Sequence, residues 1–204
     1  MHFDFNTLHP SQRYFQMIQT LIPRPIAWVL SEHENGKLNI APFSYFSAIS
    51  ADPALVMISV GKKGPDEEKD TRTNIEARKH FVIHIPSMDQ LEVMNASSAV
   101  LPAGISEIEA LELETVPFEG FPLPRLKQAK VAFGCQLHAL HEMGHGGQAV
   151  IYGEITQLYL DDNIIERDND DRIKVNAQKL DPVARLGANE YAALNAVIRL
   201  GRPA

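Results

Sequence analysis

The stretch IAWVLSEHENGKLNIAPFSYF, residues 26–46, decides the fold. A compact apolar run from Ile26 to Leu30 comes first, then Glu34-Asn35-Gly36-Lys37, and a second run begins at Leu38. Asn-Gly between two such runs predicts a β-hairpin with a type I′ turn, in which both central residues have positive φ. Pro42 cannot donate to a strand ladder, and we expect the ladder to be interrupted there.

Further strands are predicted on both sides of this hairpin. Residues 54–60 and 81–85 are dense in β-branched and apolar residues, and residues 131–139 alternate with a period of two. Residues 149–160 continue as a long strand that contains Gly153, where we expect a bulge or a close backbone approach. Strands that come singly or in hairpins, without regular alternation with long helices, favour an antiparallel barrel over a parallel sheet.

Short helices are predicted between and beside the strands. Apolar residues gather on one side of a helix over 11–21, which Pro23 and Pro25 follow. The other helix starts are indicated by residues that cap helices, namely Thr71, Ser87, Ser106 and Asn189. The fold class expected is therefore mainly β with peripheral helices, in a single domain over residues 1–204 with an excursion from the barrel at 101–124.

Composition excludes several classes of protein. The chain has 204 residues, is 45% hydrophobic and carries a net charge of -7, which makes nucleic acid a poor partner. The first ten residues do not resemble a signal peptide, and no apolar run approaches the roughly 20 residues of a membrane span. With one cysteine, Cys135, there is no intrachain disulfide, and a cytoplasmic protein without a membrane partner is expected.

One sequence motif matches a zinc-protease pattern. Residues 141–145, His-Glu-Met-Gly-His, satisfy H-E-x-x-H, which places two histidines on one face when it lies on a helix. Here the motif follows a strand of period two and runs into Gly146 and Gly147, so we expect a hairpin loop and no metal site. Cys135 is interpreted as a small buried hydrophobe, since no basic neighbour lowers its pKa.

Polar residues in two places favour the binding of a small anion, and the first is the stretch of residues 39–46 that follows the hairpin. Lys69-Asp70-Thr71-Arg72 stands at a predicted helix start, where free amides, a hydroxyl and nearby cations suit a phosphate. The alternative is that Thr71 is only a helix cap and that the lysines belong to a solvated loop. The residues alone leave both interpretations open.

The chain resembles the flavin reductase-like family of FMN-binding split-barrel proteins. The resemblance is carried in order by Arg24-Pro25-Ile26-Ala27-Trp28-Val29, residues 39–46 (NIAPFSYF), Lys69-Asp70-Thr71 with Asn74-Ile75, residues 81–83, Gly153-Glu154-Ile155, residues 184–187 with Tyr191, and Arg202-Pro203. It implies an antiparallel FMN-binding split β-barrel and a homodimer with FMN at the subunit interface. The C-terminal segment 180–204 would pack on the partner subunit.

The resemblance also implies which residues contact the cofactor. Carried over position by position, the FMN-binding residues would be Asn39, Ala41, Phe43, Ser44, Ser59, Val60, Gly61, Lys69, Asp70, Thr71, Arg185 and Tyr191. No catalytic side chain and no metal ligand is implied, because the flavin itself carries the redox chemistry. Two positions depart from the family pattern: Tyr159 stands where relatives often carry a histidine, and Gly147-Gln148 replaces an Asp-His pair.

Two functions follow as hypotheses. The first is an NAD(P)H-dependent flavin reductase that passes electrons to a redox partner protein or a small-molecule substrate. The second is an FMN-binding electron-carrier module with no nicotinamide reaction of its own. The sequence does not choose between NADH and NADPH, and it does not name the acceptor.

Overall fold

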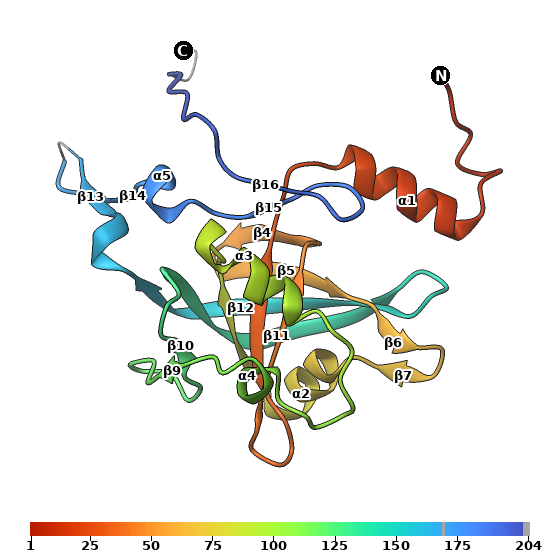
Figure 1. Ribbon diagram of the computed structural model, residues 1–204, viewed down its shortest axis with the longest axis horizontal. Helices are drawn as coiled ribbons and strands as arrows, with labels where there is room; N and C mark the ends of the chain where they lie inside the picture. The colour runs from red at the N-terminus through yellow and green to blue at the C-terminus, as the bar shows by residue number, and fades with distance from the viewer. Residues whose placement is uncertain (169, 202–204) are drawn as a thin grey trace.

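The computed structural model describes residues 1–168 and 170–201, so that Arg202 and Pro203 lie outside the described residues. The chain is mainly β, as predicted, and Figure 1 shows helices only at its periphery. The strands are β1 (Arg24–Pro25), β2 (Ala27–Glu32), β3 (Leu38–Phe43), β4 (Phe46–Ala51), β5 (Ala54–Val60), β6 (Lys62–Gly64), β7 (Glu67–Glu68), β8 (His80–His84), β9 (Thr115–Val116), β10 (Arg125–Leu126), β11 (Val131–Met143), β12 (Gln148–Leu160), β13 (Ile165–Arg167), β14 (Ile173–Val175), β15 (Ala184–Arg185) and β16 (Tyr191–Ala192).

The helices are short, and two of the four predicted caps, Ser87 and Ser106, are found. Ser87 forms a capping box with Gln90, and Ser106 accepts a hydrogen bond from the backbone N–H of Glu109. The helices are α1 (Pro10–Thr20), α2 (Asp70–Arg78), α3 (Leu91–Ala96), α4 (Glu107–Ala110) and α5 (Ala177–Leu180), with 3-10 turns η1 (Met88–Gln90) and η2 (Asp162–Ile164).

A seven-stranded antiparallel sheet forms the body of the molecule. Its strand order is β3-β2-β8-β11-β12-β5-β4, so β3 and β4 are the two outer strands. These two strands are nevertheless joined by only Ser44 and Tyr45. Two residues cannot span a flat sheet of seven strands, which is about 28 Å wide at 4.7 Å per strand, so the sheet must curl until its edges meet. Between β3 and β4 the described chain has no ladder, and the rolled sheet stays open there.

Side chains are buried on both faces of the central strands. Trp28 and Leu30 point to an outer core, which residues of α3, α4 and the segment 118–129 cover. Val29 and Phe81 point to the core inside the rolled sheet. Burial on both faces explains why the first four residues of β2 are all apolar, since a strand with one solvent-exposed face would alternate.

The long hairpin of β11 and β12 crosses the inner core. Gly153 permits the close approach expected of it, because a Cβ there would lie 2.5 Å from Cζ of Phe81. Cys135 is fully buried, and burial raises the pKa of its thiol well above the ordinary range. The interpretation of Cys135 as a buried hydrophobe is therefore confirmed.

Two local predictions in the first hairpin are wrong. The hairpin of β2 and β3 forms, but only Gly36 in its turn has positive φ, at 80°, and its N–H donates to His33 O. This is a type I turn followed by a left-handed glycine, the pattern of a three-residue loop. Pro42 does not interrupt the ladder either, for it pairs with Trp28. Proline is tolerated because β3 is an outer strand.

The two ends of the chain lie at the same end of the molecule, opposite α2 and α4 (Figure 1). The helix predicted after Asn189 is absent: residues 191–192 form β16, which pairs with β15 through Tyr191 and Arg185. That sheet pairing takes the place of the local helix signal. Within the described residues, no helix is long and apolar enough to cross a membrane.

Candidate functional site

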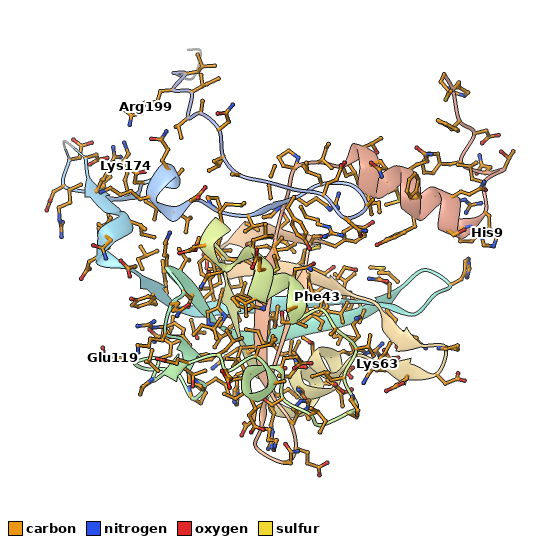
Figure 2. All side chains as sticks on the ribbon, viewed as in Figure 1. His9, Phe43, Lys63, Glu119, Lys174 and Arg199 are labelled. Carbon is orange, nitrogen blue, oxygen red and sulfur yellow. The ribbon has the colours of Figure 1, made fainter. Side chains whose placement is uncertain are left out.

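The outer strand β3 and the start of α2 form the walls of a small cavity of about 70 Å³. Two lining residues, Phe43 and Lys63, are labelled in Figure 2. The lining includes half of the residues proposed for cofactor binding, which come from two motifs about 30 positions apart in the sequence: Asn39, Ala41, Phe43, Lys69, Asp70 and Thr71. The fold therefore brings these two sequence motifs together.

Thr71 is not the cap of α2. The N-cap is Lys69, and no side chain caps the helix start. Thr71 is 1% exposed, and its Oγ1 accepts a hydrogen bond of 3.1 Å from Asn39 Nδ2. The same Asn39 amide donates to Ser31 Oγ at 3.3 Å. The Thr71 hydroxyl is thus held in place by the neighbouring strand.

Lys63 adds a buried cation beside this helix start. Its side chain is 9% exposed, and its Nζ makes no hydrogen bond with the described residues. Two carboxylates are close, with Glu67 Oε1 at 3.3 Å and Asp70 Oδ2 at 3.7 Å from Nζ. These two carboxylates pair with the charge of Lys63, and its ammonium keeps N–H donors that hydrogen-bond to none of the described residues. Such unused donors can bind an anion in the cavity.

Glu107 also lines this cavity. Its carboxylate accepts a hydrogen bond of 3.2 Å from the backbone N–H of Ile40, which fixes the edge of β3. Glu107 is 5% exposed, and this burial raises the pKa of its carboxyl group above the ordinary value. Hydrogen bonds from the backbone N–H groups of Glu107 and Ile40 oppose this shift, as does the charge of His33, whereas Asp70 raises the pKa further.

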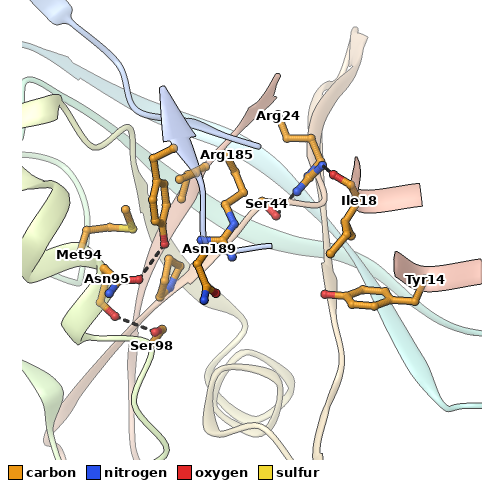
Figure 3. Close-up of a pocket in the computed structure, with 12 residues that line it drawn as sticks. Tyr14, Ile18, Arg24, Ser44, Met94, Asn95, Ser98, Arg185 and Asn189 are labelled. Carbon is orange, nitrogen blue, oxygen red and sulfur yellow. Dashed lines mark hydrogen bonds between the residues drawn. The ribbon is translucent and has the colours of Figure 1, made fainter. Parts of the chain in front are cut away.

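A larger cavity of about 580 Å³ adjoins the small one (Figure 3). Pro42 and Ser98 line both, so the two cavities share a wall on β3 and on the loop after α3. The larger cavity collects three more of the proposed residues, Ser44, Arg185 and Tyr191. Its size lies within the range of roughly 300–1,000 Å³ that is usual for small-molecule sites.

Arg24 holds the walls of the larger cavity in place. Its Nη1 donates to Ile18 O at 2.8 Å and to Leu21 O at 2.6 Å, and its Nη2 donates to Leu186 O at 2.7 Å. Its Nε lies 3.4 Å from Ser44 Oγ. This guanidinium therefore joins the end of α1, the turn after β15 and the connection between the sheet edges.

Three proposed residues lie apart from both cavities. Ser59, Val60 and Gly61 follow one another at the end of β5, and none of them lines either cavity. Ser59 Oγ accepts a hydrogen bond of 2.9 Å from Gln148 Nε2, and Val60 is fully buried. Gln148 is one of the two positions that depart from the family pattern. At the other, Tyr159, the guanidinium carbon of Arg125 lies 3.4 Å from the centroid of the tyrosine ring.

The H-E-x-x-H motif lies on a hairpin, as expected. His141 and Glu142 are at the end of β11, and His145 is in the turn before β12. Arg72 Nη2 donates to Glu142 Oε1 at 2.5 Å, and this contact holds the pKa of the Glu142 carboxyl group below its ordinary value. No cluster of metal-binding side chains occurs among the residues described.

The sequence does not single out several residues of the site. Lys63 belongs to a lysine pair that resembles a solvated loop, and Glu107 stands in an ordinary helix start. Asn95 and Ser98 carry no motif at all. The one available signal is that Lys63 lies six residues before Lys69, where the sequence predicts a helix start suited to binding a phosphate.

The structure is thus a rolled antiparallel sheet with two adjoining cavities beside its open edge. The family model for the flavin reductase like domain matches residues 19–174. The chain therefore belongs to the flavin reductase-like family.

Solved structures support this membership. Nitrilotriacetate monooxygenase component B from Bacillus cereus is 29% identical, with a TM-score of 0.90 and coverage of 98% of each chain. The 2-nitrobenzoate 2-nitroreductase of Pseudomonas fluorescens is 28% identical, with a TM-score of 0.88 and coverage of 100% of this chain and 96% of that one. A Shewanella frigidimarina protein with a split barrel domain, 23% identical over the whole of both chains, has a TM-score of 0.83 and shows the same fold.

Proposed function

We propose that the chain binds FMN along the two adjoining cavities and acts as a flavin-dependent oxidoreductase. The observation that carries this proposal is the small cavity, in which a buried cation, a fixed hydroxyl and a helix start face one another. Membership of the flavin reductase-like family supports a flavin as the ligand.

The residues present fit a phosphate at the small cavity. Lys63 Nζ lacks a hydrogen bond, and the positive end of α2 adds its backbone N–H groups. Lys69 and Thr71 would complete the phosphate end, while Asn39 holds Thr71 in position. A volume of about 70 Å³ has room for a group of phosphate size but not for a ring system.

The larger cavity would take the isoalloxazine ring. Ala41 and Phe43 would line the ribityl side, and Pro42 and Ser44 lead from one cavity to the other. Arg185 and Tyr191 would face the ring from the C-terminal hairpin, whereas Ser59, Val60 and Gly61 line neither cavity and take no part in this placement. When bound, the flavin supplies hydride or electron transfer. The side chains orient it and exclude water.

The electron donor in this proposal is NADH or NADPH, and the acceptor is a small molecule or a redox protein. The second candidate, an electron carrier without a nicotinamide reaction, is favoured by Gln148, which stands in place of the family's histidine and is engaged by Ser59. Adding NADH or NADPH anaerobically to the yellow protein separates the two. Bleaching of the flavin bands supports the reductase, and persistent colour supports the carrier.

A homodimer is part of the proposal, because apolar side chains at both chain ends are exposed. Helix α1 buries none of its residues, and Tyr14, Phe15 and Met17 are exposed on it. Leu194, Val197, Ile198 and Leu200 are exposed in the C-terminal segment. A second copy of the chain would cover such surfaces. Light scattering of the eluted protein should give twice the 22.7 kDa chain mass, and a monomer would contradict this part.

Binding of FMN is tested with the double variant Lys69→Ala, Thr71→Ala. Each hydrogen bond to a charged group contributes about 1.5–3 kcal/mol, so FMN affinity should fall by tenfold or more. Riboflavin, which lacks the phosphate, should bind both proteins equally. If FMN fluorescence is not quenched when wild-type protein is added in amounts equal to or above that of FMN, the proposed function is wrong.

A further inference from the structure

The larger cavity carries positive charge in an acidic protein. Its lining contains two arginines, Arg24 and Arg185, and no Asp or Glu among the described lining residues. The chain as a whole has 26 acidic residues against 19 Lys and Arg. The small cavity differs, because Asp70 and Glu107 line it together with its lysines. The larger cavity thus attracts an anion at its own end of the groove.

The two arginines of this cavity are not equivalent. Arg24 uses its guanidinium on three backbone carbonyls and Ser44. Arg185 donates only to Ala188 O among the described residues, and its guanidinium carbon lies 4.5 Å from the ring centroid of Tyr191. None of the ion pairs within the described chain includes Arg185. Most of its N–H donors are therefore left for a ligand.

The groups around Arg185 fit a planar acid. Figure 3 shows Arg185 above Asn189, with Asn95 and Ser98 on one side and Tyr14 on the other. Tyr191 donates to Asn95 Oδ1 at 2.8 Å, which leaves the Asn95 amide nitrogen as a donor. Guanidinium pairs with carboxylate through two parallel hydrogen bonds, and the tyrosine rings offer flat apolar surface beside it.

We propose that the larger cavity, beside the isoalloxazine ring, also holds a small planar carboxylic acid, whose carboxylate pairs with Arg185. This inference rests on the proposed function in one respect, since it makes the acid the second ligand of the flavin groove. A phosphate dianion would need several cations or a helix start, as in the small cavity. One guanidinium without an acidic partner matches a single carboxylate.

The test compares two probes that differ in charge and little in shape, benzoate and benzamide, by calorimetric titration of the FMN-saturated protein. The wild-type protein should bind benzoate at least tenfold more tightly than benzamide. Arg185→Gln should reduce this preference to less than threefold, and Arg185→Lys, which keeps the charge and loses the planar fork, should fall between. Inorganic phosphate is the third probe, and it should bind more weakly than benzoate.

The matched control replaces a second arginine that stacks on a tyrosine ring but lies outside the larger cavity. Arg125 stacks on Tyr159 at 3.4 Å and lies outside the cavity, so Arg125→Gln should keep the full preference for benzoate. The proposal is overturned by equal binding of benzoate and benzamide to the wild-type protein, by an unchanged preference in Arg185→Gln, by an equal loss in Arg125→Gln, or by phosphate binding more tightly than benzoate.

Titration of flavin-free protein separates this inference from the proposed function. If the chain does not bind FMN yet selects benzoate through Arg185, the proposed function fails and the carboxylate site stands. If FMN binds and benzoate is not selected, the carboxylate site fails alone.

Discussion

Arg24 Nη2 donates to Leu186 O over 2.7 Å, across 162 positions of the sequence. The same guanidinium, on a residue only 9% exposed, also donates to the carbonyl of Ile18 in α1 and to that of Leu21, which follows the helix. One side chain therefore fastens the N-terminal helix and the C-terminal hairpin to the groove. Loss of the guanidinium should therefore detach the N-terminal helix and the C-terminal hairpin together.

Arg24→Lys is expected to lower the free energy of unfolding by about 2–4 kcal/mol. A lysine has a single nitrogen and cannot reach three carbonyls on two segments, so buried acceptors are left unpaired. Urea unfolding measures the loss, and limited proteolysis should reveal earlier cleavage within residues 184–192. The control Arg199→Lys changes an exposed residue at the C-terminal end. Equal stability of the two variants would contradict the role given to Arg24.

Lys63→Met should weaken FMN binding by about 1.5–3 kcal/mol, or roughly ten- to a hundredfold, because it removes the buried cation from the small cavity. The neighbouring Lys62 lies outside that cavity and pairs with Glu68 at 3.6 Å. Lys62→Met is therefore the matched control and should change FMN affinity less than threefold. Fluorescence titration with FMN and riboflavin checks both, and an equal loss for the two ligands would show that no phosphate contact is involved.

His84 should make the protein sensitive to acid. The imidazole is fully buried, its Nδ1 donates to Trp28 O and its Nε2 accepts from Leu126 N–H, so the neutral form is satisfied. Burial lowers its pKa to about 4. Since the unfolded chain has a histidine pKa of about 6.5, the unfolded state binds the proton first as pH falls, and stability present above pH 6.5 is lost between 6.5 and 4.

The loss assigned to His84 amounts to about 3 kcal/mol over that window. Urea unfolding at pH 7 and pH 4.5 measures it, with His84→Gln as the variant that cannot titrate. The stability gap between wild type and His84→Gln should narrow as the pH falls. Parallel pH curves for the two proteins would show that another group controls acid unfolding.

Gly153→Ala should destabilise the long hairpin by about 1–3 kcal/mol, because the new Cβ would meet the Phe81 ring 2.5 Å away and Cys135 Cβ at 3.3 Å. A methyl group added at Gly146 would have no neighbour within 4 Å, and Gly146 has no positive φ, so Gly146→Ala is the control. Thermal unfolding compares the two variants. A midpoint for Gly153→Ala equal to that of Gly146→Ala would mean that Phe81 moves aside without cost.

The sequence predicted the strands better than their closure. Alternation over residues 131–139 and the β-branched run 54–60 are local signals, and both became strands. The helix after Asn189 failed because β16 pairs with β15, a contact that no local pattern reveals. Pro42 misled for the same reason, since its place on an outer strand depends on the whole strand order.

The candidate site was predicted in part. Asn39 and Thr71 stand in recognisable motifs, and the fold joins them by a hydrogen bond. Lys63 and Glu107 reach the small cavity from a hairpin and from a short helix whose sequences resemble ordinary surface. Their importance comes from burial, and burial of a single lysine or glutamate depends on tertiary packing that sequence spacing does not encode.

The two-residue connection between β3 and β4 acts as a tether of fixed length. Three Cα–Cα steps from Phe43 to Phe46 reach at most about 11 Å, which caps the width of the seam beside the groove. Substitutions can change the lining of the groove but cannot increase this maximum distance between the strand ends, whereas one inserted residue would increase it by about 3.5 Å. An insertion at Ser44 or Tyr45 is therefore the change that would let this fold bind larger ligands.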